Sequence, residues 1–163
     1  MREIKQGRIK ILKPFFIFII IVSIYTFIHE LVHKYVAHLL GYGGHLEFSF
    51  LTWNYIFDVV PNNSKDILLT SLMPYLLDIA LIIALLLLYY FYKNRSLFYL
   101  SIFPSLDIFI NILAIPFANW AEKGNDFLYV IQLGFSFIVW IFAVILFFLV
   151  LVQIYIWFRF IRK

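Results

Sequence analysis

Four apolar stretches, each long enough to cross a membrane as a helix, constrain the fold of this chain more than any other feature. They cover approximately residues 14–40, 67–92, 97–118 and 127–158. A helix needs roughly 20 apolar residues to cross the hydrocarbon core of a bilayer. Hydrophobic residues make up 64% of the chain and charged residues 13%, which leaves too few charges to cover a soluble domain. The sequence predicts an all-α membrane protein with four transmembrane helices in the lipid bilayer of the cell membrane.

The basic residues divide unevenly between the two sides of the membrane that this arrangement defines. Of the 13 lysines and arginines, ten lie before the first stretch, between the second and third, or after the fourth. Two lie in the other two loops, and Lys34 lies within the first stretch. Because positive residues accumulate in cytoplasmic loops, we predict that both termini are cytoplasmic. The net charge of +4 is therefore explained by the orientation of the chain in the membrane, and we expect no nucleic-acid partner. Cysteine is absent, which excludes disulfides and cysteine–zinc sites.

The longest loop, residues 41–66, contains a segment with the composition of β-strands. Residues 46–60 are rich in Phe, Trp, Tyr and Thr, which favour strands. Thr52-Trp53-Asn54 could hold a turn between two strands. The sequence predicts a short β-hairpin between the first and second helices, with an unpaired aromatic loop at the membrane interface as the alternative.

The first apolar stretch contains an HExxH sequence, His29-Glu30-Leu31-Val32-His33. On a helix, the two histidines lie one turn apart on the same face, where both imidazoles can bind one zinc ion. The glutamate between them is then close enough to the metal to act as a general base on a water molecule. The pattern predicts one zinc ion per chain and peptide hydrolysis within the membrane. The alternative is a pair of histidines held by hydrogen bonds without a metal.

A catalytic zinc site needs a third protein ligand and an open position for water. His38 lies nine residues after His29, which at about 100° per residue places it on the opposite face of the helix. His45 lies beyond the glycines that follow this helix, so it could approach only if the loop folds back. Asp78 and Asp107 lie in the second and third apolar stretches at about the depth of His29, and depth alone does not separate them.

These features together resemble the site-2 protease family of intramembrane zinc metallopeptidases. That family has a core of three membrane helices, in which the first carries HExxH and the third carries an aspartate in a Pro-x-x-Asp-Gly context. Pro104-Ser105-Leu106-Asp107 falls on the third stretch, so the resemblance implies that Asp107 is the third zinc ligand, with Asp78 as the alternative. A β-rich element between the first two core helices is also common in the family, where an extended substrate could bind by strand addition.

The resemblance covers approximately residues 15–118 and departs from the family at specific positions. Ile108 stands where the family has a glycine, and the asparagine usual some residues upstream is missing in the neighbourhood of Ser101. Asn111 follows Asp107 by four residues and therefore shares its helix face. We expect Asn111 to position the substrate or the aspartate, with a role as interhelical contact as the alternative.

The expected organisation is a basic cytoplasmic segment at residues 1–13, a three-helix zinc peptidase core at 14–118, and a fourth helix with a basic C-terminus at 119–163. The expected function is hydrolysis of a peptide bond within or near the transmembrane segment of a membrane protein substrate. No sensor domain accompanies the core in this sequence, so we expect a regulatory membrane partner.

Three other functions remain open at this stage. The first is a non-catalytic membrane protein, either a pseudoprotease or an immunity-type protein that binds a partner in the bilayer; the isoleucine after Asp107 favours it. The second is a metal or proton carrier that uses the ionisable residues as a relay. The third is a metalloenzyme that acts on a non-peptide bond.

Overall fold

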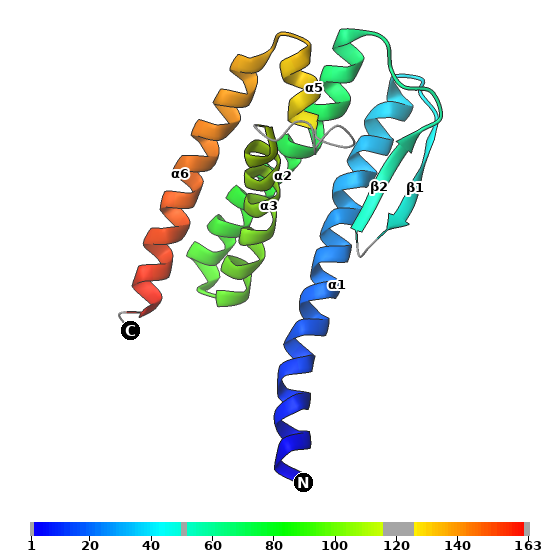
Figure 1. Cartoon of the computed structure of the whole chain (residues 1–163). Coiled ribbons are helices and arrows are strands. Elements are labelled where there is room, and N and C mark those ends of the chain that lie inside the picture. Colours follow the sequence, from blue (N-terminus) through cyan, green and yellow to red (C-terminus); the bar gives the residue numbers. More distant parts are fainter. Residues whose placement is uncertain (1, 50–51, 116–125, 162–163) are drawn as a thin grey trace.

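A computed structural model describes residues 2–49, 52–115 and 126–161 of the chain. Figure 1 shows α2, α3 and α6 as neighbouring helices, with the short α5 at one end and the long α1 beside them carrying a β-hairpin. The elements in chain order are α1 (Arg2–Leu39), β1 (Gly44–Ser49), β2 (Thr52–Phe57), α2 (Ser64–Tyr92), α3 (Arg95–Ala114), α5 (Asp126–Gln132) and α6 (Ser136–Ile161).

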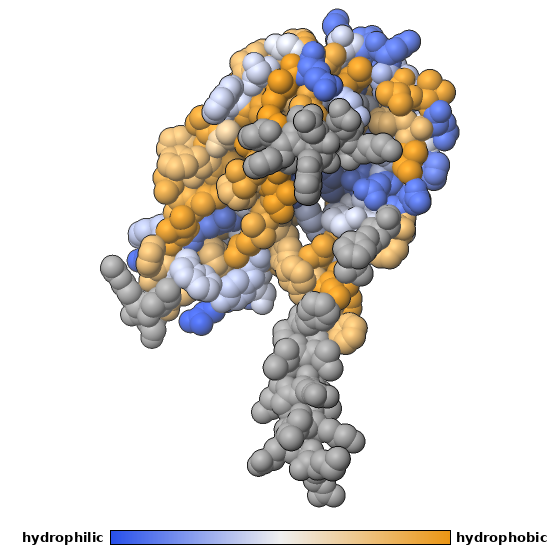
Figure 2. Space-filling model, in the orientation of Figure 1, coloured by the Kyte–Doolittle hydropathy of each residue, from blue (hydrophilic) through white to orange (hydrophobic). Residues whose placement is uncertain are grey.

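Four helices in the described part of the chain are long and apolar enough to cross a membrane, which confirms a multi-pass membrane protein. The spans are Phe16–Leu39, Ser64–Tyr92, Arg95–Leu113 and Ser136–Phe160. In Figure 2, apolar residues cover much of the visible side of the helices, and hydrophilic residues gather toward the two ends and over the hairpin. This distribution is the one that a lipid environment requires of a helical protein.

Asparagine side chains start two of the spanning helices. Asn63 accepts a hydrogen bond from the backbone N–H of Lys65 at 3.0 Å, and Asn94 accepts one from Ser96 at the same distance. Each bond satisfies one of the donors that the first turn of a helix leaves without a partner. These caps define the starts of α2 and α3, and Asn94 lies in the short turn between the two helices.

The predicted fourth stretch, residues 127–158, is not one continuous helix. Gly134 adopts a left-handed backbone conformation with φ of 85° and separates α5 from α6. The N–H of Phe135 donates to the carbonyl of Val130 at 3.1 Å, and that of Gly134 donates to Ile131 at 2.9 Å. This pair of bonds is a Schellman motif, which ends a helix where glycine can take positive φ. The spanning helix therefore begins at Ser136.

The C-terminal end of α1 has the same construction, since Gly41 has φ of 86° and the N–H of Tyr42 donates to the carbonyl of Ala37 at 2.9 Å. The chain then enters the predicted hairpin, in which β1 and β2 pair antiparallel with Leu46 opposite Tyr55. The hairpin is confirmed, but Thr52-Trp53-Asn54 does not form its turn.

Those three residues lie in β2, which is separated from β1 by residues 50–51, outside the described residues. The ring of Trp53 packs edge-on against Phe27 of α1, with centroids 5.0 Å apart, and also contacts Phe48 of β1. Aromatic burial between the hairpin and α1 thus extends β2 through the segment where the sequence indicated a turn.

An aromatic cluster joins α2, α5 and α6 and fixes where α5 lies. The ring of Tyr75 stacks on that of Phe127 at 4.3 Å, and Phe127 contacts Phe142 at 5.4 Å. All three side chains are buried. Aromatic pairs in such contact contribute about 0.5–1.5 kcal/mol each beyond the burial of their surface, so the first turn of α5 is held against α2.

Candidate metal centre

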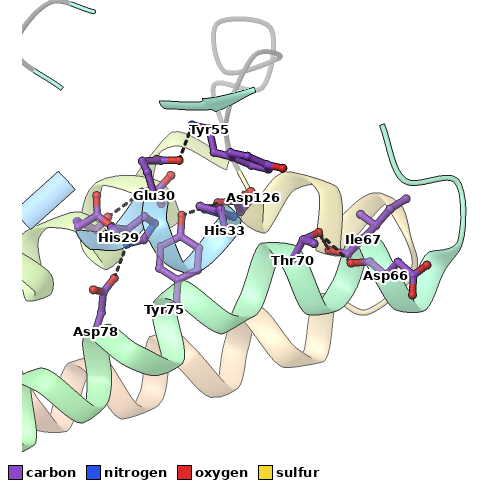
Figure 3. A network of polar contacts seen from close by, with 12 residues as sticks. His29, Glu30, His33, Tyr55, Asp66, Ile67, Thr70, Tyr75, Asp78 and Asp126 are labelled. Carbon is purple, nitrogen blue, oxygen red and sulfur yellow. Dashed lines mark hydrogen bonds and ion pairs between the residues drawn. The ribbon is translucent and has the colours of Figure 1, made fainter. Parts of the chain in front are cut away.

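The two histidines of the HExxH sequence lie on the buried face of α1, where the sequence predicted them. Each side chain is buried, and the ring centroids of His29 and His33 lie 5.3 Å apart. Figure 3 shows both rings facing side chains from α2 and α5. The i, i+4 spacing places both imidazoles on one face of α1. The packing of α2 and α5 against that face brings their carboxylates to the two rings.

Two carboxylates approach the same nitrogen of His29. Nδ1 lies 3.1 Å from Oδ2 of Asp78 on α2 and 3.6 Å from Oδ2 of Asp107 on α3. Asp78 is buried, with 1% of its surface exposed. Both predicted candidates for the third ligand are therefore adjacent to His29, and the contact with Asp78 is a hydrogen bond.

A third carboxylate, which the sequence analysis did not identify, contacts the second histidine. Oδ2 of Asp126, the first residue of α5, lies 3.2 Å from Nε2 of His33. The hydroxyl of Tyr75 donates to the same oxygen at 3.4 Å. Asp126 lies directly before the expected fourth stretch. Its position in a loop beside an apolar segment was the only feature of the sequence that indicated a role for it.

The ligand atoms form two overlapping groups in the described part of the chain. One contains His29, His33 and Asp126, and the other contains His29, Asp78 and Asp107; within each group all ligand atoms lie within 4.8 Å of one another. Two imidazoles and a carboxylate are a donor set that suits zinc. A carboxylate on the other nitrogen of one imidazole is also typical of zinc sites. The residues present fit a zinc ion.

Glu30 is held by the hairpin. Its Oε2 accepts a hydrogen bond from the backbone N–H of Tyr55 at 2.7 Å. The N–H of Trp53, two residues earlier on the same edge of β2, lies 3.4 Å from Oγ1 of Thr26. Alternate amides of β2 therefore point at α1 rather than at β1. The strand orients the glutamate between the two histidines.

The other predicted residues have the following positions. Asn111 donates to the backbone carbonyl of Asp107 at 3.0 Å, so it is linked to the aspartate through the main chain of α3. Ile108, the residue after Asp107, is fully buried in the hydrophobic core. His38 is exposed, which confirms that it faces away from the site. His45 lies 3.7 Å from Asp58, and both side chains are more than half exposed.

Two buried polar atoms near His29 have no hydrogen-bond partner among the described residues. They are the hydroxyl of Tyr25 and Oδ2 of Asp107. Buried polar atoms are nearly always paired, so a carboxylate oxygen left in this state beside an imidazole fits the neighbourhood of a cation.

Comparisons with known proteins place no constraint on this site, because no protein-family model, curated protein or solved structure matches the chain.

Proposed function

We propose that this protein is an intramembrane zinc metallopeptidase. It hydrolyses a peptide bond within or near the transmembrane segment of a membrane protein substrate. The observation that carries the proposal is the burial of His29 and His33 among aspartates on the face of a spanning helix, with Glu30 between them. Ionisable residues inside a membrane protein are costly, which makes each one a functional candidate.

The ligands of the proposed zinc ion are His29, His33 and one aspartate. The resemblance to the site-2 protease family names Asp107 for the third position, and its buried Oδ2 lies 3.6 Å from Nδ1 of His29. Asp126 is a further candidate, because it shares a group of closely spaced ligand atoms with both histidines. When bound, a zinc ion would supply a Lewis acid that polarises the scissile carbonyl and lowers the pKa of a coordinated water.

Glu30 is the general base in this proposal. It takes a proton from the attacking water and passes it to the leaving amine. The hydrogen bond from Tyr55 to Oε2 fixes the orientation of the carboxylate, so that Oε1 is the oxygen that receives the proton. Fixation at two points, the backbone of α1 at one end and the strand amide at the other, reduces the reorientation that proton transfer requires.

The membrane orientation that we propose has both termini in the cytoplasm. In Figure 1, the start of α1, the α2–α3 turn and the end of α6 lie at one end of the molecule, and the hairpin and α5 lie toward the other. Ten of the 13 basic residues belong to the first end by their sequence positions, which is the bias that cytoplasmic segments show. The HExxH sequence then lies in the half of the bilayer away from the cytoplasm.

The substrate must present an extended backbone, because the amides of an intact transmembrane helix are already hydrogen-bonded. Segments with glycine, proline or polar residues unwind at the lowest cost and are therefore the expected targets. Asn111, near Asp107 on α3, is proposed to help position that segment. A regulatory membrane partner is proposed to control access to the site.

The test is cleavage of a single-span membrane protein with a glycine- or proline-containing span, reconstituted with the purified protein in detergent. Wild type cleaves it, a zinc chelator stops cleavage, and Glu30→Gln reduces the rate by about 10²–10⁴-fold. Glu47→Gln, which changes an exposed glutamate on β1, is the matched control and keeps wild-type activity. Absence of cleavage by the wild type would refute the peptidase and favour a non-catalytic protein that binds a partner in the bilayer, and equal cleavage by wild type and Glu30→Gln would refute the role of Glu30 as general base.

A further inference from the structure

We propose that Asp126, at the start of α5, is the third protein ligand of the metal centre, and that Asp78 and Asp107 hold His29 from its opposite side. This inference rests on the zinc site of the proposed function. It places one zinc ligand outside the three-helix core, at a position that the HExxH sequence does not indicate.

The contacts of His29 indicate which of its two nitrogens faces the metal. Nδ1 is hydrogen-bonded to Asp78 at 3.1 Å. A carboxylate on Nδ1 fixes the proton on that nitrogen and leaves the lone pair of Nε2 for a metal ion. Asp107 approaches the same Nδ1, at 3.6 Å. Both aspartates therefore lie on the side of the ring that a metal bound at Nε2 does not occupy.

His33 and Asp126 are spaced as two zinc ligands would be. Nε2 of His33 lies 3.2 Å from Oδ2 of Asp126. A tetrahedral zinc ion with bonds of about 2.0–2.2 Å separates its ligand atoms by about 3.4 Å, so this pair is already spaced as two ligands of one ion. Asp126 forms a common group with both histidines, whereas among the described residues Asp107 is grouped with His29 and Asp78.

Asp126 is anchored against α2. Its Oδ2 accepts a hydrogen bond from the hydroxyl of Tyr75 at 3.4 Å, and the next residue, Phe127, stacks on the ring of Tyr75. A ligand at the end of a buried helix is better fixed than one in a loop. His29, His33 and Asp126 would then supply the three protein ligands that a catalytic zinc site uses, with Glu30 beside them as the general base.

The strongest observation for the competing assignment is Oδ2 of Asp107, which is buried without a hydrogen-bond partner among the described residues. The two assignments differ in what each aspartate contributes to zinc affinity. Loss of a carboxylate that only holds a ligating histidine lowers metal affinity about 10- to 100-fold. Loss of a direct ligand lowers it further, because the ion then loses one of three protein donors.

The experiment is a zinc titration of the purified protein in detergent, with the zinc content of each sample measured alongside. Asp126→Asn and His33→Ala should each lower zinc affinity more than about 100-fold, while Asp78→Asn and Asp107→Asn should lower it about 10- to 100-fold. The absorption bands of bound Co²⁺ give a second readout, since they change when the ligand set changes. They should change for Asp126→Asn and stay close to wild type for Asp107→Asn.

A histidine substitution separates lost ligation from lost folding. Asp126→His supplies a new zinc donor at the same position and should recover much of the affinity that Asp126→Asn loses, whereas Asp107→His should recover none beyond Asp107→Asn. Zinc affinity of Asp126→Asn within tenfold of wild type, together with loss of binding in Asp107→Asn, would overturn the inference and leave the proposed function standing. A wild type that binds no zinc would overturn both. Zinc binding that depends on Asp126, without any cleavage of single-span substrates, would support the inference and count against the peptidase.

Discussion

The hydrogen bond between Glu30 and Tyr55 makes the coupling of the hairpin to the HExxH helix measurable without a substrate. Glu30→Ala removes the acceptor of the Tyr55 amide proton. The bond is short, 2.7 Å, and its acceptor is a carboxylate, so it belongs to the stronger class of hydrogen bonds, worth about 1.5–3 kcal/mol. If local opening governs exchange, this energy corresponds to an increase of about 10- to 150-fold in the exchange rate of the Tyr55 amide.

The contact between Trp53 and Thr26 provides a weaker hydrogen bond on the same strand for comparison. The amide of Trp53 faces the neutral hydroxyl of Thr26 at 3.4 Å, near the long limit for a hydrogen bond. Thr26→Val should therefore accelerate exchange at Trp53 by no more than about tenfold, the equivalent of about 1.5 kcal/mol. Glu47→Ala, on the exposed side of β1, should leave both amides unchanged.

The assay is amide hydrogen exchange in detergent, followed by NMR at the Tyr55 and Trp53 amides. Glu30→Ala should accelerate Tyr55 far more than the amides of β2 that pair with β1. Exchange at Tyr55 within about twofold of wild type, which corresponds to less than about 0.5 kcal/mol, would refute the claim that the strand fixes the glutamate. Equal acceleration across the whole hairpin would refute it as well, because it would show that the substitution destabilises the hairpin as a unit.

Three further predictions concern the rest of the fold. Nε2 of Gln153 lies within 3.1 Å of three acceptors on α3, but an amide nitrogen has only two protons. At about 0.6 kcal/mol per interhelical bond in a membrane, Gln153→Leu should lower the free energy of unfolding in detergent by about 1 kcal/mol, and the exposed Val152→Leu should leave it unchanged. Gly41→Ala should cost about 1–2 kcal/mol in the same measurement, because Gly41 has φ of 86° and no described residue lies within 4 Å of the added methyl group to offset the strain. The hydrogen bond from the Tyr42 hydroxyl to Asp66 raises the pKa of Tyr42 above 10.0. This hydrogen bond therefore stabilises the folded state below pH 10, and the stabilisation is lost as pH rises through the raised pKa. Asp66→Asn should lower that pKa, as measured by tyrosinate absorbance relative to a Tyr42→Phe reference.

The fold follows from sequence wherever a local pattern decides it. Apolar length alone predicts the four spans, and the aromatic composition of residues 46–60 predicts the hairpin. The break at Gly134 was also readable, since a glycine inside an apolar helix pattern is a frequent C-terminal cap. The turn placed at Thr52-Trp53-Asn54 was wrong because the contact of Trp53 with Phe27 depends on how the hairpin packs on α1, which local sequence does not encode.

Local sequence patterns likewise predict some residues of the candidate site and not others. The helical period places His29 and His33 on one face, and it places His38 on the other. Depth in the membrane could not separate Asp78 from Asp107, and the structure brings both to Nδ1 of His29. The approach of Asp126 depends on α5 folding back against α2, which is a tertiary contact between segments about 50 residues apart. No local pattern in the sequence predicts that contact.

The central claim is that the HExxH helix holds a zinc ion, and the zinc content of purified protein tests it most directly. Wild type should contain about one zinc ion per chain, as a single site with three protein ligands requires. His33→Ala should contain almost none, and His38→Ala, which changes the exposed histidine on the same helix, should match the wild type. A wild type that stays free of zinc after incubation with the metal, or a His33→Ala variant with wild-type zinc content, would contradict the account.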